Sequence, residues 1–93
     1  MKLENLLKPH IGGLTGSEIK ALIVIFMCTI PFGMKSRKIT NETFMDIGGK
    51  HLMTKANVVK ATNSLHDKEI VFKVLDEFDS INIYSINDKG LSL

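Results

Sequence analysis

The sequence has little of what secreted and membrane proteins depend on. It holds one cysteine, Cys28, and two prolines among its 93 residues. A lone cysteine excludes an internal disulfide and is typical of a protein in a reducing cytoplasm. No apolar run reaches the roughly 18–20 residues that a membrane-spanning helix requires, because the longest one, residues 21–30, ends at Pro31. The composition therefore predicts a soluble, cytoplasmic chain with no membrane partner.

Signals for secretion, metal binding and catalysis are also missing. The first residues, MKLENLLKPH, place Glu4 and Asn5 inside the apolar part and lack a small-residue cleavage site, so they do not predict a signal peptide. His10, His51 and His66 are scattered, and no close ligand pair accompanies them. The triplet GGK lacks the earlier glycine and the following serine or threonine of a phosphate-binding loop. We therefore expect no enzyme activity, no cofactor and no metal.

Length and charge point to one small domain with an uneven surface. A chain of 93 residues with 44% hydrophobic content can close a single modest core. Residues 34–65 hold six basic and two acidic side chains, whereas residues 66–93 hold three and six. A basic stripe on a small domain is a weak sign of a nucleic-acid partner. A solvated protein face carries the same charges, so charge alone leaves both interpretations open.

The N-terminal part predicts a flap and then a long helix. Residues 1–13 form the expected flap, a short amphipathic turn ended by Pro9 and a glycine pair. Residues 14–93 form the expected main domain. Its first helix begins at Thr15, because Glu18 three residues later completes a capping box. The row expected to face the core follows helical spacing and consists of Ile19, Leu22, Ile23, Phe26, Met27 and Ile30.

The same helix carries a second apolar row. A helix that is apolar nearly all round is buried on more than one side. Either the N-terminal flap or a second copy of the chain would cover the additional side. The second option predicts a homodimer through Ala21, Val24, Ile25 and Cys28.

The rest of the chain alternates short elements. SRKIT predicts a short extended segment, and NETFMDIGG predicts a brief helix capped by Thr40. A longer helix follows over residues 55–67, with Thr54 as its cap and an inner row of Val58, Ala61, Thr62 and Leu65. EIVFKVL and SINIYSI predict two strands of a hairpin. This order predicts an α+β fold, a winged helix-turn-helix with a three-helix core and a C-terminal β-hairpin wing.

Four segments carry a more specific likeness. In chain order they are LTGSEIKALIVIF, ITNETFMDIGG, TKANVVKATNSLHDKEIV and NIYSIN, which lie within residues 14–87. Their order and approximate spacing resemble the N-terminal domain of the phage replication protein O family, the origin-binding initiators of lambdoid and related phages, and similar plasmid initiators. The resemblance implies binding to double-stranded DNA at repeated origin sites, with the helix of residues 55–67 in the major groove.

The side chains of this helix suit such a role. Amide and cationic groups can read base edges in the major groove, and small apolar groups can contact a thymine methyl. The expected base-reading residues are Ala56, Asn57, Val59, Lys60 and Asn63. The expected phosphate contacts are Lys50, Thr54 and Lys55, with His51 beside them, and Lys35, Arg37 and Lys38 on a neighbouring stretch of backbone. An ordinary solvated helix would present the same side chains.

The sequence departs from the O-type pattern in several places. Glu69 stands where the family often turns with glycine, so the helix is expected to end in another way. Asp76, Glu77 and Asp79 surround the hairpin tip and would be repelled by phosphates. We therefore expect the wing to face away from the duplex or to contact a replication or transcription protein. The chain also ends soon after the last strand, where O-type initiators continue into a region that engages the helicase-loading machinery.

Two other functions stay open. A small winged-helix transcription regulator would share the chemistry of the helix over residues 55–67. A winged-helix interaction module would not bind DNA, and would use the apolar first helix and the acidic hairpin to bind another protein.

Overall fold

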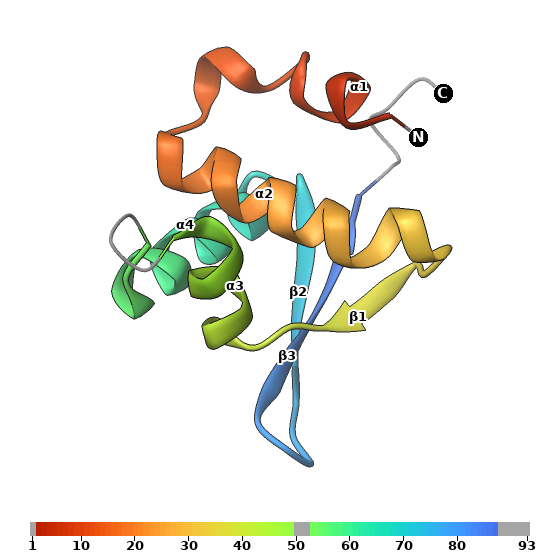
Figure 1. Ribbon diagram of the computed structural model, residues 1–93, viewed down its shortest axis with the longest axis vertical. Helices are drawn as coiled ribbons and strands as arrows, with labels where there is room; N and C mark the ends of the chain where they lie inside the picture. Colours follow the sequence, from red (N-terminus) through yellow and green to blue (C-terminus); the bar gives the residue numbers. More distant parts are fainter. Residues whose placement is uncertain (1, 50–52, 88–93) are drawn as a thin grey trace.

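A computed structural model describes residues 2–49 and 53–87 of the chain (Figure 1). Within those ranges the fold is α+β, with helices packed on one face of a three-stranded antiparallel sheet. The elements in chain order are α1 (Leu3–Leu7), the 3₁₀ turn η1 (Ile11–Gly13), α2 (Gly16–Thr29), the 3₁₀ turn η2 (Ile30–Phe32), β1 (Ser36–Lys38), α3 (Asn41–Gly48), α4 (Lys55–Asp67), β2 (Val71–Asp76) and β3 (Ile81–Ile86). None of the helices in these ranges is long and apolar enough to cross a membrane.

Threonine side chains begin the main helices where the sequence predicted. Thr15 Oγ1 accepts a hydrogen bond from the Glu18 amide at 3.2 Å, and the Glu18 carboxylate accepts one from the Thr15 amide at 3.3 Å. This is the predicted capping box. Thr40 and Thr54 accept bonds from the amides three residues later and so cap α3 and α4. Each helix therefore starts where the sequence supplies an acceptor for an amide that would otherwise lack one.

The sheet positions the hairpin beside the helices. Its strand order is β1-β3-β2, so β1 and β2 form opposite edges. β2 and β3 form the predicted hairpin, with Lys73 opposite Tyr84. Val71 and Tyr84 point toward the helices and are fully buried, whereas Phe72 and Val74 point outward and are 41% and 58% exposed. Since α4 packs on β2, β1 lies at the sheet edge away from that contact.

Aromatic packing joins the sheet to the helices. The rings of Phe44 on α3 and Tyr84 on β3 meet edge to face, with centroids 5.2 Å apart and planes at 72°. Burial raises the pKa of the Tyr84 hydroxyl. Thr62 and Asn82 nearby offset part of this rise without meeting the hydroxyl at hydrogen-bond geometry. The other large, fully buried core side chains include Leu22, Ile25, Met53, Val58 and Leu65.

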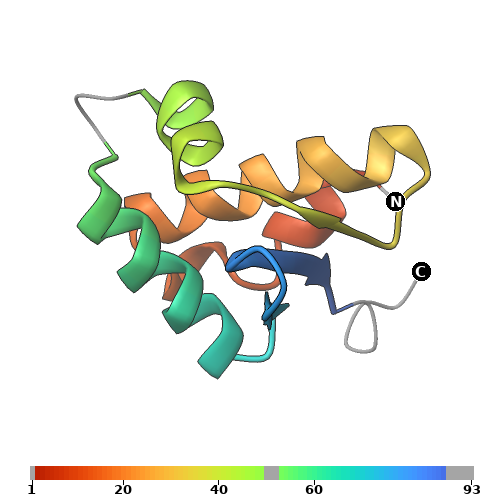
Figure 2. The same cartoon turned by 90° about the horizontal axis from the view of Figure 1, so that it is seen from below.

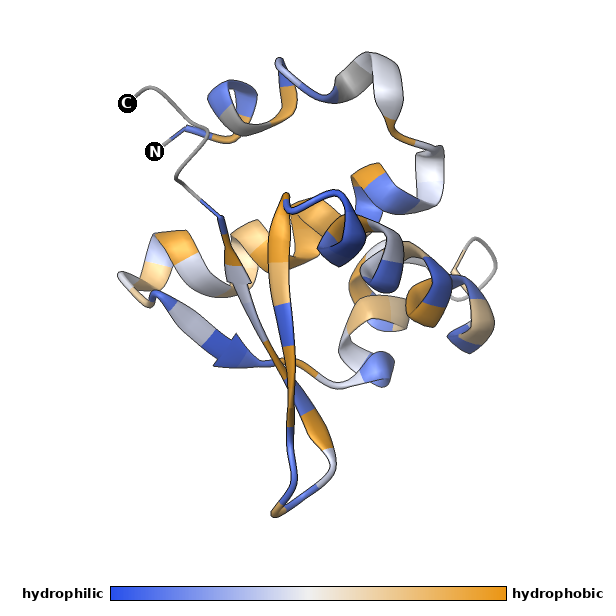
Figure 3. Cartoon of the chain, turned by 180° about the vertical axis from the view of Figure 1, so that it is seen from behind, coloured by the Kyte–Doolittle hydropathy of each residue, from blue (hydrophilic) through white to orange (hydrophobic). Residues whose placement is uncertain are grey.

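The helix α2 is enclosed on more sides than its predicted core row accounts for. It contacts α1, α3, α4, β1 and β3, and Figure 3 shows that it is hydrophobic along most of its length. The α1 segment, the expected flap, adds partly buried leucines to the core. Ala21, Val24 and Ile25 are at most 1% exposed, so the predicted homodimer surface is wrong in its location. Cys28 is half-buried, and Met27, expected in the core, is 48% exposed.

The end of α4 also differs from expectation. Glu69 has a φ of 60°, the left-handed conformation that glycine adopts most readily. The chain therefore turns here in the glycine-like way, and the expectation of a different helix end was wrong. The amide of Ile70 donates to the Leu65 carbonyl at 3.0 Å, and Asn87 Nδ2 donates to the Glu69 carbonyl at 2.7 Å. These bonds hold the turn that leads from α4 into β2.

Candidate nucleic-acid interface

The helix α4 divides cleanly into a buried side and an exposed side. Its inner row is the predicted one, because Val58, Ala61, Thr62 and Leu65 are all at most 3% exposed. The outward side presents every residue expected to read bases: Ala56, Asn57, Val59, Lys60 and Asn63. Thr54 and Lys55 are exposed at the start of the same helix. The sequence thus predicted the orientation of α4 correctly.

The outward side of α4 is cationic over a long stretch. Asp46 and Asp67 bound a segment in which no residue is acidic. Among the residues that the structure describes, neither Lys55 nor Lys60 forms an ion pair with a carboxylate. Both ammonium groups are therefore available to an anionic partner.

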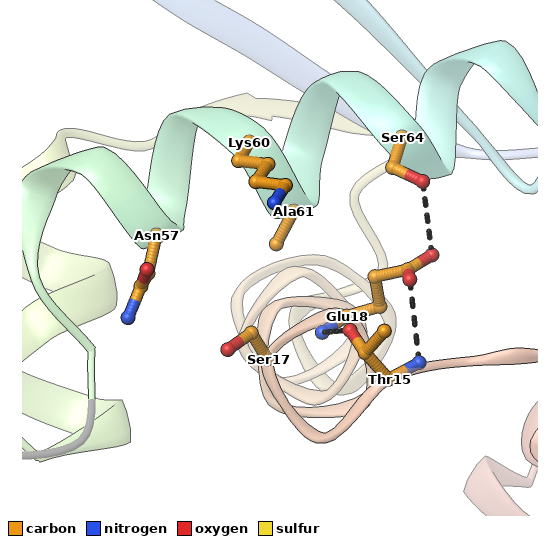
Figure 4. A pocket seen from close by; sticks show the side chains of 7 residues that line it. All are labelled: Thr15, Ser17, Glu18, Asn57, Lys60, Ala61 and Ser64. Atoms are coloured by element: carbon orange, nitrogen blue, oxygen red, sulfur yellow. Dashed lines mark hydrogen bonds between the residues drawn. The ribbon is translucent and has the colours of Figure 1, made fainter.

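A shallow cleft separates part of this surface from the start of α2. Asn57, Lys60 and Ser64 lie on the side of α4 that faces the first turn of α2 (Figure 4). The cleft has a volume of about 240 Å³, and its remaining lining residues are Thr15, Ser17, Glu18 and Ala61. It is open to solvent and bordered by two of the predicted base-reading residues, Asn57 and Lys60. The sequence did not predict that the start of α2 would lie beside them.

Glu18 fixes the geometry of this cleft. Its side chain is nearly buried, and Oε2 accepts hydrogen bonds from Lys68 Nζ at 2.7 Å and Ser64 Oγ at 3.1 Å. Burial by itself raises the pKa of this carboxyl, but the bonds from Lys68, Thr15 and Ser64 together outweigh it and leave the pKa below its ordinary value. Glu18 is therefore ionised at neutral pH and is matched by the Lys68 cation. The bonds tie the last turns of α4 to the first turn of α2.

Lys73 contacts α4 from the sheet. From β2 its Nζ donates to Asn63 Oδ1 at 2.8 Å and to Thr62 Oγ1 at 3.0 Å. Its backbone amide donates to His66 Nδ1 at 3.1 Å. Burial lowers the pKa of Lys73. The Asn63 amide is thus held in one orientation, with its NH₂ group and one oxygen lone pair left for a partner.

Lys73 was missed in the sequence, although a signal existed. Residues 71, 73 and 75 of a strand share one face, and Val71 is an apolar residue expected inside. A lysine on that face must point toward the helices. The alternation of inward and outward side chains along the strand could therefore have predicted that Lys73 lies beside α4.

The predicted phosphate contacts on β1 do not join α4. Arg37 Nη1 donates to the Cys28 carbonyl at 3.3 Å, and the guanidinium lies 5.1 Å from the Phe32 ring centroid, at the C-terminal end of α2. The cleft beside α4 lies at the opposite end of that helix. Lys35 is exposed but lines a hollow with residues of η2, β2 and β3. The structure thus does not bring Arg37 or Lys35 together with α4. Lys50 and His51 lie outside the described residues.

Lys38 forms ion pairs with two carboxylates of the hairpin tip. Its Nζ lies 2.8 Å from Asp76 Oδ2 and 2.6 Å from Asp79 Oδ2. The hydrogen bonds with Asp76 and then Asp79 raise the pKa of Lys38, and the same bonds lower the pKa of both carboxyls. Lys38 is therefore paired with the hairpin acids, and its role as a phosphate contact stays a prediction. No local sequence pattern predicts that residues 38 and 79 would meet.

The resulting surface can bind an extended, anionic and polar partner. It combines amide and ammonium groups on one rigid helix, with small residues between them. Lys73 on β2 holds the Asn63 side chain in one orientation. Comparison of the chain with models of protein families, with curated proteins and with solved structures finds no match. Function is therefore inferred from the geometry of α4 and its neighbours.

Proposed function

We propose that this chain is a winged helix-turn-helix domain that binds double-stranded DNA in a sequence-specific way, with α4 in the major groove. The element order supports the fold. A long helix, a short strand and two consecutive helices precede a β-hairpin, and the short strand completes the sheet through β3. In this arrangement α3 and α4 form the helix-turn-helix and β2 with β3 forms the wing. Figure 2 shows α3 and α4 at an angle to each other beside α2.

The observation that carries the proposal is the outward side of α4. It has exposed Asn57, Lys60 and Asn63 on a helix whose only acidic residue is the last one, Asp67. Asparagine pairs well with adenine and lysine with guanine, and Ala56 and Val59 supply apolar surface for thymine methyl groups. The absence of acidic side chains from residues 55–66 also avoids repulsion of phosphates.

The dimensions of the helix agree with a short recognition site. From Ala56 to Asn63 the helix advances about 10 Å at roughly 1.5 Å per residue. Base pairs repeat at about 3.4 Å, so these side chains span about three of them. Lys55 and the Thr54 hydroxyl lie at the start of the helix, where they suit phosphate contacts that fix the register. Thr54 keeps its hydroxyl proton for this purpose, because only its oxygen serves the helix cap.

The hairpin supports a docking geometry in which the wing tip is not pressed against DNA. Two of its three acidic side chains are directed to Lys38 on β1, and β1 is the edge strand away from the α4 contact. The remaining acid, Glu77, would be repelled by phosphates. The duplex is thus read mainly by α4.

The biological role we favour is binding at a replication origin in the cytoplasm of a bacterial host. It is supported by the resemblance of residues 14–87 to the O-type initiators. A transcription regulator would use the same helix in the same way. The location of the bound sites in the replicon, at an origin or at a promoter, decides between the two.

The test is selection of DNA fragments by the purified chain. Fragments of the encoding replicon are captured against an excess of random competitor at low and at moderate salt. We expect enrichment of a few fragments that persists as salt rises, because base contacts add to the salt-dependent phosphate term. Uniform binding that vanishes with salt would reduce α4 to a non-specific cationic surface, and absence of binding at both salts would contradict the proposal.

A further inference from the structure

The tip of the β2–β3 hairpin presents an aromatic side chain on a rigid loop. Phe78 is 99% exposed. Asp76 Oδ1 accepts a bond from the Phe78 amide at 2.9 Å, and Asp79 Oδ1 accepts one from the Ile81 amide at 3.0 Å. Lys38 joins both carboxylates to β1. Two loop bonds and an ion-paired cation thus hold the loop around an almost fully exposed phenyl ring, which makes the tip pre-organised for binding.

An apolar pocket lies at the other end of the Lys38 side chain. It is formed between the C-terminal end of α2, β1 and α3, with a volume of about 320 Å³. Roughly 150 Å³ is enough to hold a benzene ring. Its lining residues are Met27, Cys28, Phe32, Arg37, Lys38, Ile39, Thr43 and Ile47. Met27, Phe32 and Ile47 are 48%, 65% and 45% exposed, so this surface is apolar and uncovered.

The charges of the tip and the pocket are complementary. Glu77, next to Phe78, forms no hydrogen bond or ion pair among the described residues. Arg37 at the pocket contacts only a carbonyl and the Phe32 ring, and no carboxylate in the described part of the chain. An acidic aromatic tip therefore matches an apolar pocket with a free cation at its border.

We propose that these two features bind each other between two copies of the chain. Phe78 of each copy enters the pocket of the other, and Glu77 pairs with Arg37 of the partner subunit. Because Lys38 belongs to both features, tip and pocket are neighbours on one surface. A single two-fold axis can then form both contacts at once, as in the self-complementary interfaces of most homodimers. DNA does not fit this surface, since the acids of the tip repel phosphates.

This dimer goes beyond DNA binding and does not depend on it. It also differs from the dimer predicted from sequence, whose apolar row lies inside the core. Cys28 is common to both, but here it acts as part of a pocket wall.

The first test is sedimentation velocity of the full chain from micromolar to millimolar concentration. We expect a reversible dimer whose dissociation constant rises at least about 30-fold in Phe78→Asp, the effect of removing an interface anchor. Phe72→Asp is the matched control, because it adds the same charge near the start of β2, away from the hairpin turn that carries Phe78, and lies outside the contact. A wild-type chain that stays monomeric throughout, or a Phe78→Asp variant that still dimerises normally, would overturn the proposal.

The second test keeps Phe78 and traps the contact. Glu77→Cys adds one thiol beside the anchor in a chain whose only other thiol is Cys28. Mild oxidation should yield a covalent dimer in which mass spectrometry identifies peptides 77 and 28 of different chains as the linked pair. Asp67→Cys, an exposed thiol at the end of α4, should not link to Cys28. Failure of the Glu77→Cys link to Cys28 would exclude the proposed contact while leaving the DNA-binding proposal untouched.

Discussion

Replacing Lys60 and Asn63 together by alanine should reduce the preference for the selected DNA site by roughly 100- to 1,000-fold. A good base contact in the major groove contributes about 1–3 kcal/mol of discrimination, and the two side chains lie on the same exposed side of α4. Loss of Lys60 should also reduce the slope of log binding constant against log salt concentration by about one, because one fewer counterion is released. The measurement is fluorescence anisotropy with the selected duplex and a scrambled one, over a range of salt.

The control for this result makes the same two types of substitution at a site away from α4. Asn5→Ala with Lys8→Ala removes the same residue types and the same charge from the exposed N-terminal region, away from α4. That variant should retain the full preference for the selected site. If both double variants lose preference equally, or if neither does, α4 is not the reading helix.

Removing the carboxylate of Glu18 should produce the largest loss of stability among the polar substitutions. In Glu18→Gln the nearly buried group loses its charge, and Lys68 loses its carboxylate partner. Hydrogen bonds to charged groups contribute about 1.5–3 kcal/mol. Because Lys68 is partly exposed, we expect a decrease of about 2 kcal/mol in the free energy of unfolding at neutral pH. Urea unfolding measures it, and Glu42→Gln on the exposed first turn of α3 is the matched control.

The same carboxyl should make stability depend on pH. The folded-state pKa of Glu18 is lowered by its hydrogen bonds, so its contribution is complete above the ordinary glutamate pKa of about 4.3. It is lost as the pH falls through the lower folded value. The difference in unfolding free energy between wild type and Glu18→Gln should therefore stay constant from about pH 7 to about pH 5 and shrink as the pH falls below about 4.3. A difference that stays constant or grows below that pH would contradict this role.

Local patterns predicted the elements of the fold, but not every partner of those elements. The caps at Thr15, Thr40 and Thr54 were readable because each depends on atoms three residues apart. The inner row of α4 was readable because one side of the helix is apolar and the other is not. In α2 this contrast is missing. Periodicity could therefore not decide which of its rows would contact the chain's own core, and Met27 and Ile25 were placed on the wrong sides.

The candidate site was predicted where it depends on one helix and missed where it depends on distant contacts. Asn57, Lys60 and Asn63 follow from helical spacing alone. Lys38 was expected at phosphates because a lysine in an exposed strand has no local partner, yet the antiparallel pairing of β1 with β3 brings it to the hairpin acids. Such contacts join residues about forty positions apart. They are fixed by the topology of the sheet, which the local sequence does not specify.

A dimer formed through Phe78 would constrain the DNA site. Two copies related by a two-fold axis read two copies of a half-site in opposite orientation. Selected fragments should then contain inverted repeats with a fixed spacing. Single, isolated half-sites would fit a chain that binds DNA as a monomer.

Recognition of DNA by α4 can be observed directly by NMR mapping of the selected duplex on the ¹⁵N-labelled chain. We expect the largest shifts at the amides of residues 54–63 and at the side-chain NH₂ groups of Asn57 and Asn63, with little change around Phe78. Shifts concentrated on the hairpin or on the outer face of the sheet, with α4 unperturbed, would contradict it.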